Sequence, residues 1–581
     1  MVSGSHDILT TARQLMERRP GFADSVEASP TTFTSVVRHL WFPKWGGGGF
    51  YSIVNDISGG VSKVYKMLMG TDANYILMFT SSTNGPFDFA ITNDTLFMGN
   101  GTDMRKFKSG SSTTKWGIAA PAAAPTIGTT STGISAFSGW YYVYTYCNSS
   151  TGHESSASPL SVCTGIVSNK SVQVTVVASA DVQVDQIRVY RTTDGGTTDP
   201  TAMRELSNSP FANTNATILD TTTDVLLSVR TGPGFTSNDP PTPSDKLTTD
   251  ATGGRIFTAQ NATTYFSAQE ELPSGSEGSP WECFPSGADG NSYSWPQEVQ
   301  AQGTQADGVA ILTRGKIWKV AGNLRSNFIQ QGLLDRRGAI SVTAVASLGN
   351  SVAWLDTASQ VFLDGQEIGF DIRPDIKNID HSQAYLCIHI SGRFHWVCLL
   401  DGANGKIYVY DMDTGQWLPP FVLPGPASAL SSGESSSGNV VLTVALGKTK
   451  MYNLNTAKFN DGGTAYGAVV ATNLMDMANP NESPTQPLIS IVAETDANIP
   501  SKVEYILDDD PTISPVYTDI TKNVSNPTLR ANDSPANLVK SIYQPDGSPN
   551  GERCGIRITW PTVDQSFVCY TITMNDQNQG G

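Results

Sequence analysis

The residues best suited to chemistry by type and spacing are two cysteine–histidine pairs, Cys387-x-His389 and His395-x-x-Cys398. Thiolate sulfur and imidazole nitrogen are the usual ligands of structural zinc, and a β-hairpin can bring two such pairs together. If the hairpin turn centres on Gly392, His389 and His395 face each other across the strands. Cys387 then lies on the same face, whereas Cys398 points to the opposite one, because side chains alternate along a strand. We therefore expect these residues to pack between sheets, with a zinc site as the alternative.

Two other short matches to functional motifs have simpler explanations. Residues 191–198, RTTDGGTT, nearly match the Asp box of sialidases, but Asp199 stands where that motif has an aromatic residue. A turn between two strands explains the match better, since Asp-Gly is a common hairpin former. The GKT at residues 447–449 lacks the first glycine of a phosphate-binding loop, because Leu442 is at that position.

Carboxylates offer the remaining chemistry. The run Asp508-Asp509-Asp510 is followed by Pro511, which breaks the spacing of a calcium-binding EF-hand, so we interpret it as a solvated turn. Exposed pairs such as Asp371 and Asp375 could do acid–base work only if a cleft held them about 5 to 10 Å apart. The chain has no GxSxG and no HExxH motif. The sequence therefore predicts no catalytic residue, no metal ligand and no cofactor-binding residue, and hence no enzyme.

The elements that must position all these residues are β-hairpins, which repeat between residues 254 and 454. Each unit has an alternating apolar strand, a polar or glycine turn, and an aromatic residue in the later strand. The first strands and their turns are GRIFTAQ with Asn261-Ala262, VAILT with Arg314-Gly315, SVAWLD with Thr357-Ala358, YLCIHI with Ser391-Gly392, and NVVLTVAL with Gly447-Lys448. Such alternation indicates hairpins, and its recurrence is typical of propeller blades. In DMDTGQW (411–417) we expect Trp417 to pack between blades.

The hairpin pattern begins at residue 50 and is interrupted once. The Pro/Ala-rich linker GIAAPAAAP and the later PPTPSD enclose about 100 residues whose strands fit a fibronectin- or immunoglobulin-like module. We predict an all-β protein: a β-propeller with an inserted fibronectin/Ig-like β-sandwich and a C-terminal β region. The predicted parts are an N-terminal arm (1–49), first propeller blades (50–117), the inserted sandwich (118–245), the remaining blades (246–460), and a C-terminal β domain (461–581) with a disordered tail, NDQNQGG.

Two local predictions concern the N-terminal arm. Residues 6–17 place Ile8, Leu9, Ala12, Leu15 and Met16 at helical spacing, and Pro20-Gly21 would end the helix. The run WGGGGF (45–50) is too rich in glycine for the interior of an element, so we expect a flexible loop there.

Composition narrows the class of protein. The 581 residues include only 15% charged residues but 54 Gly and 33 Pro, which fits a large all-β protein of short strands. No apolar run approaches a membrane span, and the first residues, MVSGSHDILTT, lack the basic-then-apolar order of a signal peptide. Seven cysteines without repeated spacing do not indicate a disulfide framework. We expect synthesis in a reducing cytoplasm. The formal net charge of −16 argues against tight nucleic-acid binding but suits an acidic passage that must not grip DNA.

The segments together resemble a known family. The ERRPGF run (17–22) and NDTLFMGNGTDMRKF (93–107) resemble signatures of phage tail proteins, YYVYTYCNSSTGHESSASPLS (141–161) resembles their fibronectin-like insertion, and residues 254–365 resemble their propeller core. The whole is similar to podophage tail nozzles, the family of the T7-type tail tubular protein B. The resemblance covers most of residues 15–460, and the order of the motifs is its stronger part.

The resemblance implies a structural role in the virion tail. A homo-hexameric ring would continue the tail channel below an adaptor ring, with tail fibres or tailspikes nearby and host-surface contact at its distal end. Double-stranded DNA would pass through the lumen without specific binding. The alternatives are a propeller glycosidase or depolymerase and a receptor-binding adhesin acting on host surface glycans. For the adhesin, aromatic residues of WYYVYTY (140–146) could stack on sugars, although Trp140, Tyr142, Tyr144 and Tyr146 share one face and alternation predicts that half of the rings are core.

Overall fold

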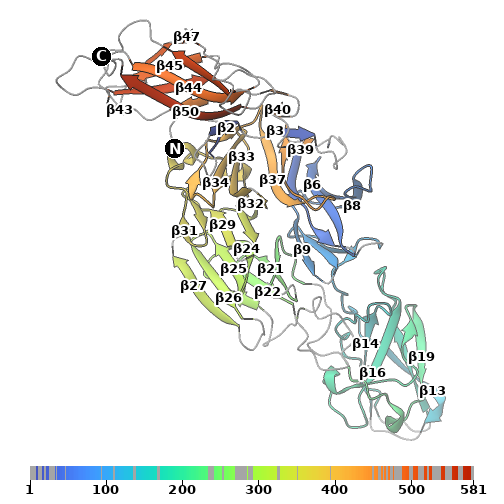
Figure 1. Ribbon diagram of the computed structural model, residues 1–581. Coiled ribbons are helices and arrows are strands. Elements are labelled where there is room, and N and C mark those ends of the chain that lie inside the picture. Colours follow the sequence, from blue (N-terminus) through green and yellow to red (C-terminus); the bar gives the residue numbers. More distant parts are fainter. Residues whose placement is uncertain are drawn as a thin grey trace.

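The computed structural model describes most of the chain between residues 33 and 455 and the separate strands before and after it. The described residues are 8–10, 16–18, 21–24, 33, 36–45, 47–92, 94–108, 111–134, 139–165, 170–232, 241–250, 254–267, 284, 292–322, 328–335, 337–349, 351–392, 394–447, 450–455, 460–461, 464–465, 469–471, 475–476, 487–495, 502–507, 516–519, 523–525, 538–543, 553–559 and 567–576. Three β-rich parts follow one another in space, with the propeller between the inserted sandwich and the C-terminal domain (Figure 1).

The described residues form seven antiparallel sheets of propeller type, each with four main strands. In chain order they are blade 1, β4 (Val36–Trp41), β6 (Gly49–Ser58), β7 (Val61–Leu68) and β8 (Ile76–Thr80), with β5 (Lys44–Trp45) beside β6; blade 2, β9 (Asp88–Thr92), β10 (Thr95–Gly99), β11 (Met104–Lys108) and β12 (Thr114–Lys115); blade 3, β20 (Lys246–Thr249), β21 (Ile256–Gln260), β22 (Thr263–Phe266) and β23 (Ser292–Ser294); and blade 4, β24 (Val299–Gln305), β25 (Gly308–Thr313), β26 (Lys316–Ala321) and β27 (Ile329–Asp335).

The remaining three blades follow without interruption. They are blade 5, β28 (Val345–Leu348), β29 (Ser351–Leu355), β30 (Val361–Leu363) and β31 (Gln366–Glu367); blade 6, β32 (Ala384–Ser391), β33 (Phe394–Asp401), β34 (Lys406–Asp411) and β35 (Gln416–Trp417), with β36 (Phe421–Val422) beside β34; and blade 7, β37 (Ala427–Glu434), β38 (Val440–Leu446), β39 (Lys450–Asn455) and β3 (Gly21–Asp24). Short helices η5 (Val342–Ala344), α1 (Arg373–Ile376) and η6 (His381–Gln383) connect blades 4 to 6.

Turn chemistry and alternation explain why these hairpins form. Between β6 and β7 the turn residues Gly59 and Gly60 have φ angles of 59° and 84°, a left-handed conformation that glycine adopts at little cost. Apolar residues of neighbouring blades then meet face to face. One such layer between blades 5 and 6 contains Leu355, Val397 and Trp417, which confirms the prediction that Trp417 packs between blades.

The ring is closed by a strand from the N-terminal end of the chain. β3 pairs with β39, so blade 7 combines residues about 430 positions apart in sequence. Phe22 of β3 is fully buried in the apolar cluster of blades 1, 6 and 7, and its backbone N–H donates to Asp461 at 2.9 Å. This closure joins the two ends of the propeller sequence, so the ring does not depend on contacts between consecutive hairpins alone.

The ring also continues across the inserted domain. Blades 2 and 3 are consecutive in the ring but are separated in sequence by residues 116–245. They share an apolar cluster that includes Phe97, Trp116 and Ile256, and the N–H of Gly101 donates to the carbonyl of Ser244 at 2.9 Å. The two chain segments that lead into and out of the insertion are therefore held together at its base.

The insertion is a two-sheet sandwich. One sheet contains β13 (Thr126–Ile134), β15 (Lys170–Val176) and β19 (Ala216–Asp220), and the other contains β14 (Tyr142–Cys147), β16 (Gln186–Arg191), β17 (Arg204–Glu205) and β18 (Phe211–Ala212). The helices η1 (Pro200–Ala202) and η2 (Asp224–Leu226) lie in its connections. The inward side chains of both sheets form one apolar core that includes Val174, Ile187 and Ile218. This confirms the predicted fold class of a propeller with an inserted sandwich.

The C-terminal region forms two further sheets. The first contains β1 (Ile8–Thr10), β2 (Met16–Arg18), β50 (Phe567–Asp576), β44 (Pro487–Thr495), β48 (Leu538–Tyr543) and β47 (Asn523–Ser525), in this order. The second contains β42 (Val469–Ala471), β49 (Arg553–Thr559), β45 (Lys502–Leu507) and β46 (Val516–Asp519), with β43 (Met475–Asp476) beside β49. A hairpin of β40 (Asn460–Asp461) and β41 (Thr464–Ala465) leads into this region.

The structure corrects the predictions for the N-terminal arm. The described part of residues 6–17 is strand, not helix, because Met16 and Glu17 pair with Cys569 and Val568 of β50, and this tertiary pairing overrides a weak helical pattern. Blade 1 begins at β4, before residue 50. A β-bulge between Val37 and His39 disrupts the alternation that would have revealed this strand.

Two loop predictions also change. The glycine run is a tight hairpin between β5 and β6, in which Gly47 and Gly48 have φ angles of 78° and 97°. At the other end of the chain, Asn575 and Asp576 of the expected disordered tail still pair with β44, while residues 577–581 lie outside the described residues. In the part of the chain that the structure describes, no helix is long and apolar enough to span a membrane.

Candidate functional site

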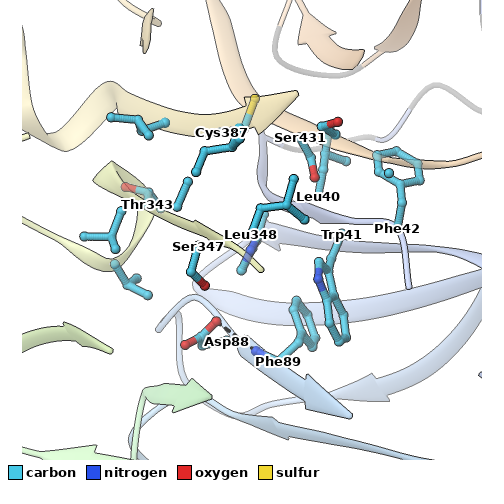
Figure 2. A pocket seen from close by; sticks show the side chains of 18 of the residues that line it. Leu40, Trp41, Phe42, Asp88, Phe89, Thr343, Ser347, Leu348, Cys387 and Ser431 are labelled. Atoms are coloured by element: carbon cyan, nitrogen blue, oxygen red, sulfur yellow. Dashed lines mark hydrogen bonds between the residues drawn. The ribbon is translucent and has the colours of Figure 1, made fainter. Parts of the chain in front are cut away.

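A cavity of about 610 Å³ lies on the axis of the propeller. Residues from the first strand of each of the seven blades line it, together with η5 and the start of β38. Figure 2 shows side chains from several of these strands, including Leu40, Phe89, Ser347 and Cys387, around the cavity. The cavity is therefore a place where residues from all seven blades, far apart in sequence, lie around one space.

Aromatic and aliphatic side chains form much of the cavity wall. Trp41 of β4 stacks on Phe89 of β9 with ring centroids 5.8 Å apart, and both are visible at one side of the cavity in Figure 2. Leu348, Leu386 and Ile390 line other parts of the wall. An apolar lining of this kind favours neutral or amphipathic occupants over strongly charged ones.

Asp88 is the most strongly buried acid of the lining, and it serves the structure of the ring. Its carboxylate accepts hydrogen bonds from the N–H of Phe89 at 2.9 Å and from the N–H of Leu247 at 2.7 Å, which ties blade 2 to blade 3. Burial raises the pKa of Asp88, while His39 and the two N–H donors act in the opposite direction. Both carboxylate oxygens of Asp88 are thus occupied by backbone.

Side-chain hydroxyl and amide groups on the same wall form hydrogen bonds with one another and with backbone carbonyls. The Thr304 hydroxyl lies 2.9 Å from that of Thr248 and donates to the carbonyl of Thr249 at 2.6 Å. The Gln302 side-chain amide donates to the carbonyl of Lys246 at 3.0 Å, while its oxygen has no hydrogen-bond partner. These contacts join blades 3 and 4, and they leave one buried acceptor beside the cavity.

The charged residues of the lining do not form a catalytic arrangement among the described residues. Arg38 forms a hydrogen bond with Tyr385, and Glu434 is exposed. General acid–base catalysis requires a free acid and base within reach of one substrate atom, and glycoside hydrolysis requires two free carboxyls facing each other. Because Asp88 is held by two backbone donors, the described lining of the cavity shows no such pair.

The strand pairing of the cysteine–histidine hairpin differs from the expected one. In the hairpin, Cys387 pairs with Cys398 and Ile390 pairs with His395. The expected arrangement of facing histidines is therefore replaced by one in which the two cysteines share a face and His395 lies on the other. The expectation that His389 and His395 face each other was wrong, because a two-residue turn shifts the register by one position.

Each of these four residues has a local role. His389 is buried, lies 2.9 Å from the Ser432 hydroxyl through Nδ1, and has a pKa lowered to about 4 by burial. His395 is partly exposed, and its Nδ1 lies 2.8 Å from the Asp413 carboxylate. Burial raises the pKa of the Cys398 thiol, which packs in the apolar cluster with Cys387. Within the described residues, no group of three or more potential ligands is placed to hold a metal ion.

The other sequence matches also fall at structural positions. The Asp-box-like run begins at the end of β16 in the sandwich, where the N–H of Asp194 donates to Asp224 at 2.7 Å. Gly447 ends a strand before the turn to β39, and the following two residues of the GKT lie outside the described residues. Residues 508–510 lie outside them as well. Asp371 and Asp375 are both exposed beside α1, and neither lines the cavity.

The aromatic strand of the sandwich is core. Trp140, Tyr142, Tyr144 and Tyr146 are all buried in the cluster between the two sheets. The face that was considered for stacking on sugars is therefore covered by the opposite sheet. This removes the specific observation that would have favoured a carbohydrate-binding adhesin.

Sequence reasoning missed the cavity residues. Asp88 comes from blade 2, whereas Gln302 and Thr304 come from blade 4, and no local spacing links the two blades. The cavity is lined by the first strand of every blade, so its residues can be predicted once those seven strands are assigned correctly. The signal in the sequence was therefore the repeat of the hairpins.

The geometry defines the chain as a closed seven-bladed β-propeller with a sandwich inserted between its second and third blades, within the described residues. No family model and no curated protein matches the chain. Among solved structures, similar ones include a streptogramin B lyase (8% identity, 75% of this chain and 93% of that chain, TM-score 0.25) and BBS1N in complex with ARL6DN (9%, 75% and 98%, TM-score 0.25). A virginiamycin B lyase from Staphylococcus aureus has 9% identity over 73% of this chain and 96% of that chain, with a TM-score of 0.25. These likenesses are too remote to bear on activity.

Proposed function

We propose that this chain is a structural protein of a bacteriophage virion: a tail nozzle subunit that acts without enzymatic activity. In this role a ring of copies, six by the family resemblance, extends the tail channel, closes its distal end and conducts DNA during genome ejection. The observation that carries the proposal is the order of the parts. The sandwich interrupts the propeller after blade 2, between the two groups of sequence motifs that resemble nozzle proteins.

The size of the propeller cavity supports a lumen built by several copies. The major groove of DNA alone is about 12 Å wide, so a duplex cannot enter a cavity of about 610 Å³. A DNA passage therefore requires a ring of chains in which each propeller forms part of the wall. The propeller then acts as a rigid building block, and its own axis is not the channel.

The charge of the chain fits a passage that releases its cargo. At −16 per chain, six copies carry −96 formal charges. A wall with excess negative charge repels the phosphate backbone and avoids the counterion release that drives tight binding. We expect DNA to pass through this lumen without specific contacts.

The elongated arrangement offers separate surfaces for neighbours in the tail. The sandwich and the C-terminal domain extend from different ends of the propeller (Figure 1). We propose that these ends contact the tail adaptor ring and the tail fibres or tailspikes, and that the distal end meets the host cell surface. The chain is synthesised in the cytoplasm of the bacterial host and is incorporated into the virion.

The test is to purify virus particles from the source culture, identify the chain by mass spectrometry, and determine the tail structure by electron microscopy. We expect the chain at the distal end of the tail in a closed ring. The matched biochemical test is incubation of the purified protein with host surface polysaccharide. Release of short saccharides by the protein, together with its absence from particles, would replace this proposal with a depolymerase.

A further inference from the structure

We propose that this chain binds a second copy of itself head to tail, through two different faces on opposite flanks of the propeller. The edge face consists of β8 and the strands β7, β11 and β12 of blades 1 and 2. The pocket face consists of a pocket between blades 4 and 5 and the adjoining residues 364–380. The inference rests on the proposed assembly of several copies, and it specifies which surfaces meet.

The edge face carries an apolar strand, β8, that is partly exposed in the described part of the chain. The Thr113 hydroxyl donates to the carbonyl of Met78 at 3.1 Å. β8 is the outermost strand of blade 1, so one of its edges has no partner strand. Ile76 and Leu77 are 48% and 51% exposed, and Met78 and Phe79 are half-buried. Exposed edge strands of soluble proteins usually carry charges or proline, which prevent association. An apolar edge of this kind indicates a binding surface.

Cations surround this strand. The strands β7, β11 and β12 carry six basic residues, and neither they nor β8 contain a carboxylate; the six are Lys63, Lys66, Arg105, Lys106, Lys108 and Lys115. The Lys66 ammonium lies 4.3 Å from the ring centre of Phe107, and the Arg105 guanidinium lies 4.4 Å from that of Phe79. Arg105 also pairs with Asp103, the residue before β11, at 3.3 Å, so the edge face keeps a smaller excess of positive charge in a chain with a net charge of −16.

The pocket face offers an apolar depression. A pocket of about 370 Å³ lies between blades 4 and 5, with Leu312, Ile317 and Val352 in its wall. Leu333 of β27 also lines it and is 44% exposed. Trp354 lines the same pocket, and its buried indole N–H has no hydrogen-bond partner. A side chain of Ile or Leu size fits such a pocket, as anchor residues do at protein interfaces.

The charge beside this pocket is opposite to that of the edge face. Residues 364–380 contain five carboxylates and two basic residues. Asp364 and Gln366 of this segment also line the pocket, so the acidic segment begins at its rim. An apolar strand among cations on one face and an apolar pocket beside carboxylates on the other are complementary in shape and in charge.

The positions of the two faces determine the kind of assembly. β8 lies on one flank of the propeller, while β27 and β31 lie on the opposite flank (Figure 1). Two faces on opposite flanks cannot meet within one chain. They can meet between copies, and a contact between unlike faces produces a ring when its rotation closes. A second copy therefore fits both faces: its pocket face meets the edge face of the first copy, and its edge face can meet the pocket face of a further copy.

The experiment uses full-length chains with one face altered in each. The edge variant is Leu77→Lys. The pocket variant combines Leu333→Lys with Gln366→Lys. The control is Val225→Lys, which introduces the same charge at a sandwich residue that is 92% exposed. Sedimentation velocity follows the unmodified protein up to on the order of 100 μM, where weak contacts are populated. Circular dichroism verifies that each variant is folded.

We expect the unmodified protein and the control to form dimers and larger species, with weaker association at high salt. Each single-face variant is expected to remain monomeric. An equimolar mixture of the edge and pocket variants should form a dimer and nothing larger, since it retains one intact pair of faces. A mixture that stays monomeric while the unmodified protein associates would overturn the inference, as would an unmodified protein that stays monomeric throughout this range.

These outcomes separate the inference from the proposed function. A tail ring in which other surfaces meet would contradict the two faces and leave the nozzle proposal standing. A dimer in the mixture, combined with absence of the chain from virus particles, would support the faces and contradict the nozzle. Binding of a different virion protein to the edge face, with no self-association, would also contradict the inference.

Discussion

The propeller and the inserted sandwich are stabilised in different ways. The described interfaces between blades are mainly apolar clusters, such as the one that contains Phe22, Leu400 and Val444. The sandwich also has an apolar core, but two networks of buried charges flank it. A ring of seven blades distributes its stability over many similar contacts, whereas a small domain depends on a few specific ones.

The first network centres on Arg191 of β16. This residue is fully buried, forms ion pairs with Asp220 at 2.9 Å and with Asp224 at 2.5 Å, and lies 3.6 Å from the ring centre of Trp140. The Tyr142 hydroxyl donates to Asp220 at 2.8 Å. Residues from both sheets and from η2 therefore meet at one guanidinium, which fixes how the sheets are oriented.

The second network centres on Glu154. Its carboxylate accepts hydrogen bonds from Thr145 and Tyr190, both at 2.6 Å, and from Arg230 at 2.7 Å. The nearby negative charge of Glu154 adds to burial in raising the pKa of Cys147 to about 12, so this thiol stays protonated. The comparison teaches that polar groups provide specific orientation in the sandwich, whereas repetition provides it in the propeller.

The largest expected effect is on the sandwich. Arg191→Met leaves the carboxylate of Asp220 buried without its partner, and loss of one partner of a buried ion pair costs about 3 to 5 kcal/mol. We expect hydrogen exchange, followed by mass spectrometry, to accelerate in the sandwich while the propeller stays protected. The control is Arg204→Met, at an exposed position of β17. Equal acceleration in both domains would contradict the view that this network stabilises the sandwich specifically.

The closing strand of the propeller gives the next effect. Phe22→Ala removes a fully buried ring from blade 7, and such changes cost about 3 to 4 kcal/mol. The loss should lower the thermal unfolding temperature of the propeller and leave exchange in the sandwich unchanged. Phe370→Ala is the control, because Phe370 is 70% exposed. An unchanged unfolding temperature for Phe22→Ala would show that the ring does not need β3.

A pH dependence should arise from His389. The unfolded chain takes up a proton there near pH 6.5, while the folded chain does so only near pH 4. Stability is therefore present above pH 6.5 and falls as pH decreases towards 4, by about 3 kcal/mol in total. Denaturant unfolding at several pH values should show a shallower slope for His389→Gln than for the unmodified protein. An unchanged slope for His389→Gln would show that this imidazole is not the source of the pH dependence.

The smallest effect concerns the joint between blades 2 and 3. Asp88→Asn replaces two acceptor oxygens by one, so either Phe89 or Leu247 loses the acceptor for its N–H, at a cost of about 1 to 2 kcal/mol. The unfolding midpoint in urea should decrease accordingly. Asp375→Asn, at an exposed position, is the control. If Asp88→Asn stabilises the protein, burial of the Asp88 charge costs more free energy than its two hydrogen bonds with the N–H groups of Phe89 and Leu247 contribute.

The sequence predicts local structure well where turns and alternation agree. The hairpins at Asn261-Ala262 and Arg314-Gly315 form as expected because short-range chemistry determines them. β3 could not be predicted, since its partner β39 lies at the far end of the propeller sequence. The opposite faces of His389 and His395 follow from a turn shifted by one residue, which periodicity cannot resolve. The cavity needed all seven first strands to be assigned.

The central claim is that several copies of this chain form the distal ring of a virus tail. Electron microscopy of particles from the source culture tests it most directly, with the chain located by fitting its propeller and sandwich. The account predicts a six-fold ring whose lumen admits a DNA duplex and whose wall is acidic. A particle without this chain, or a chain present as a single copy with a carboxylate-lined cleft that holds a sugar, would contradict the claim.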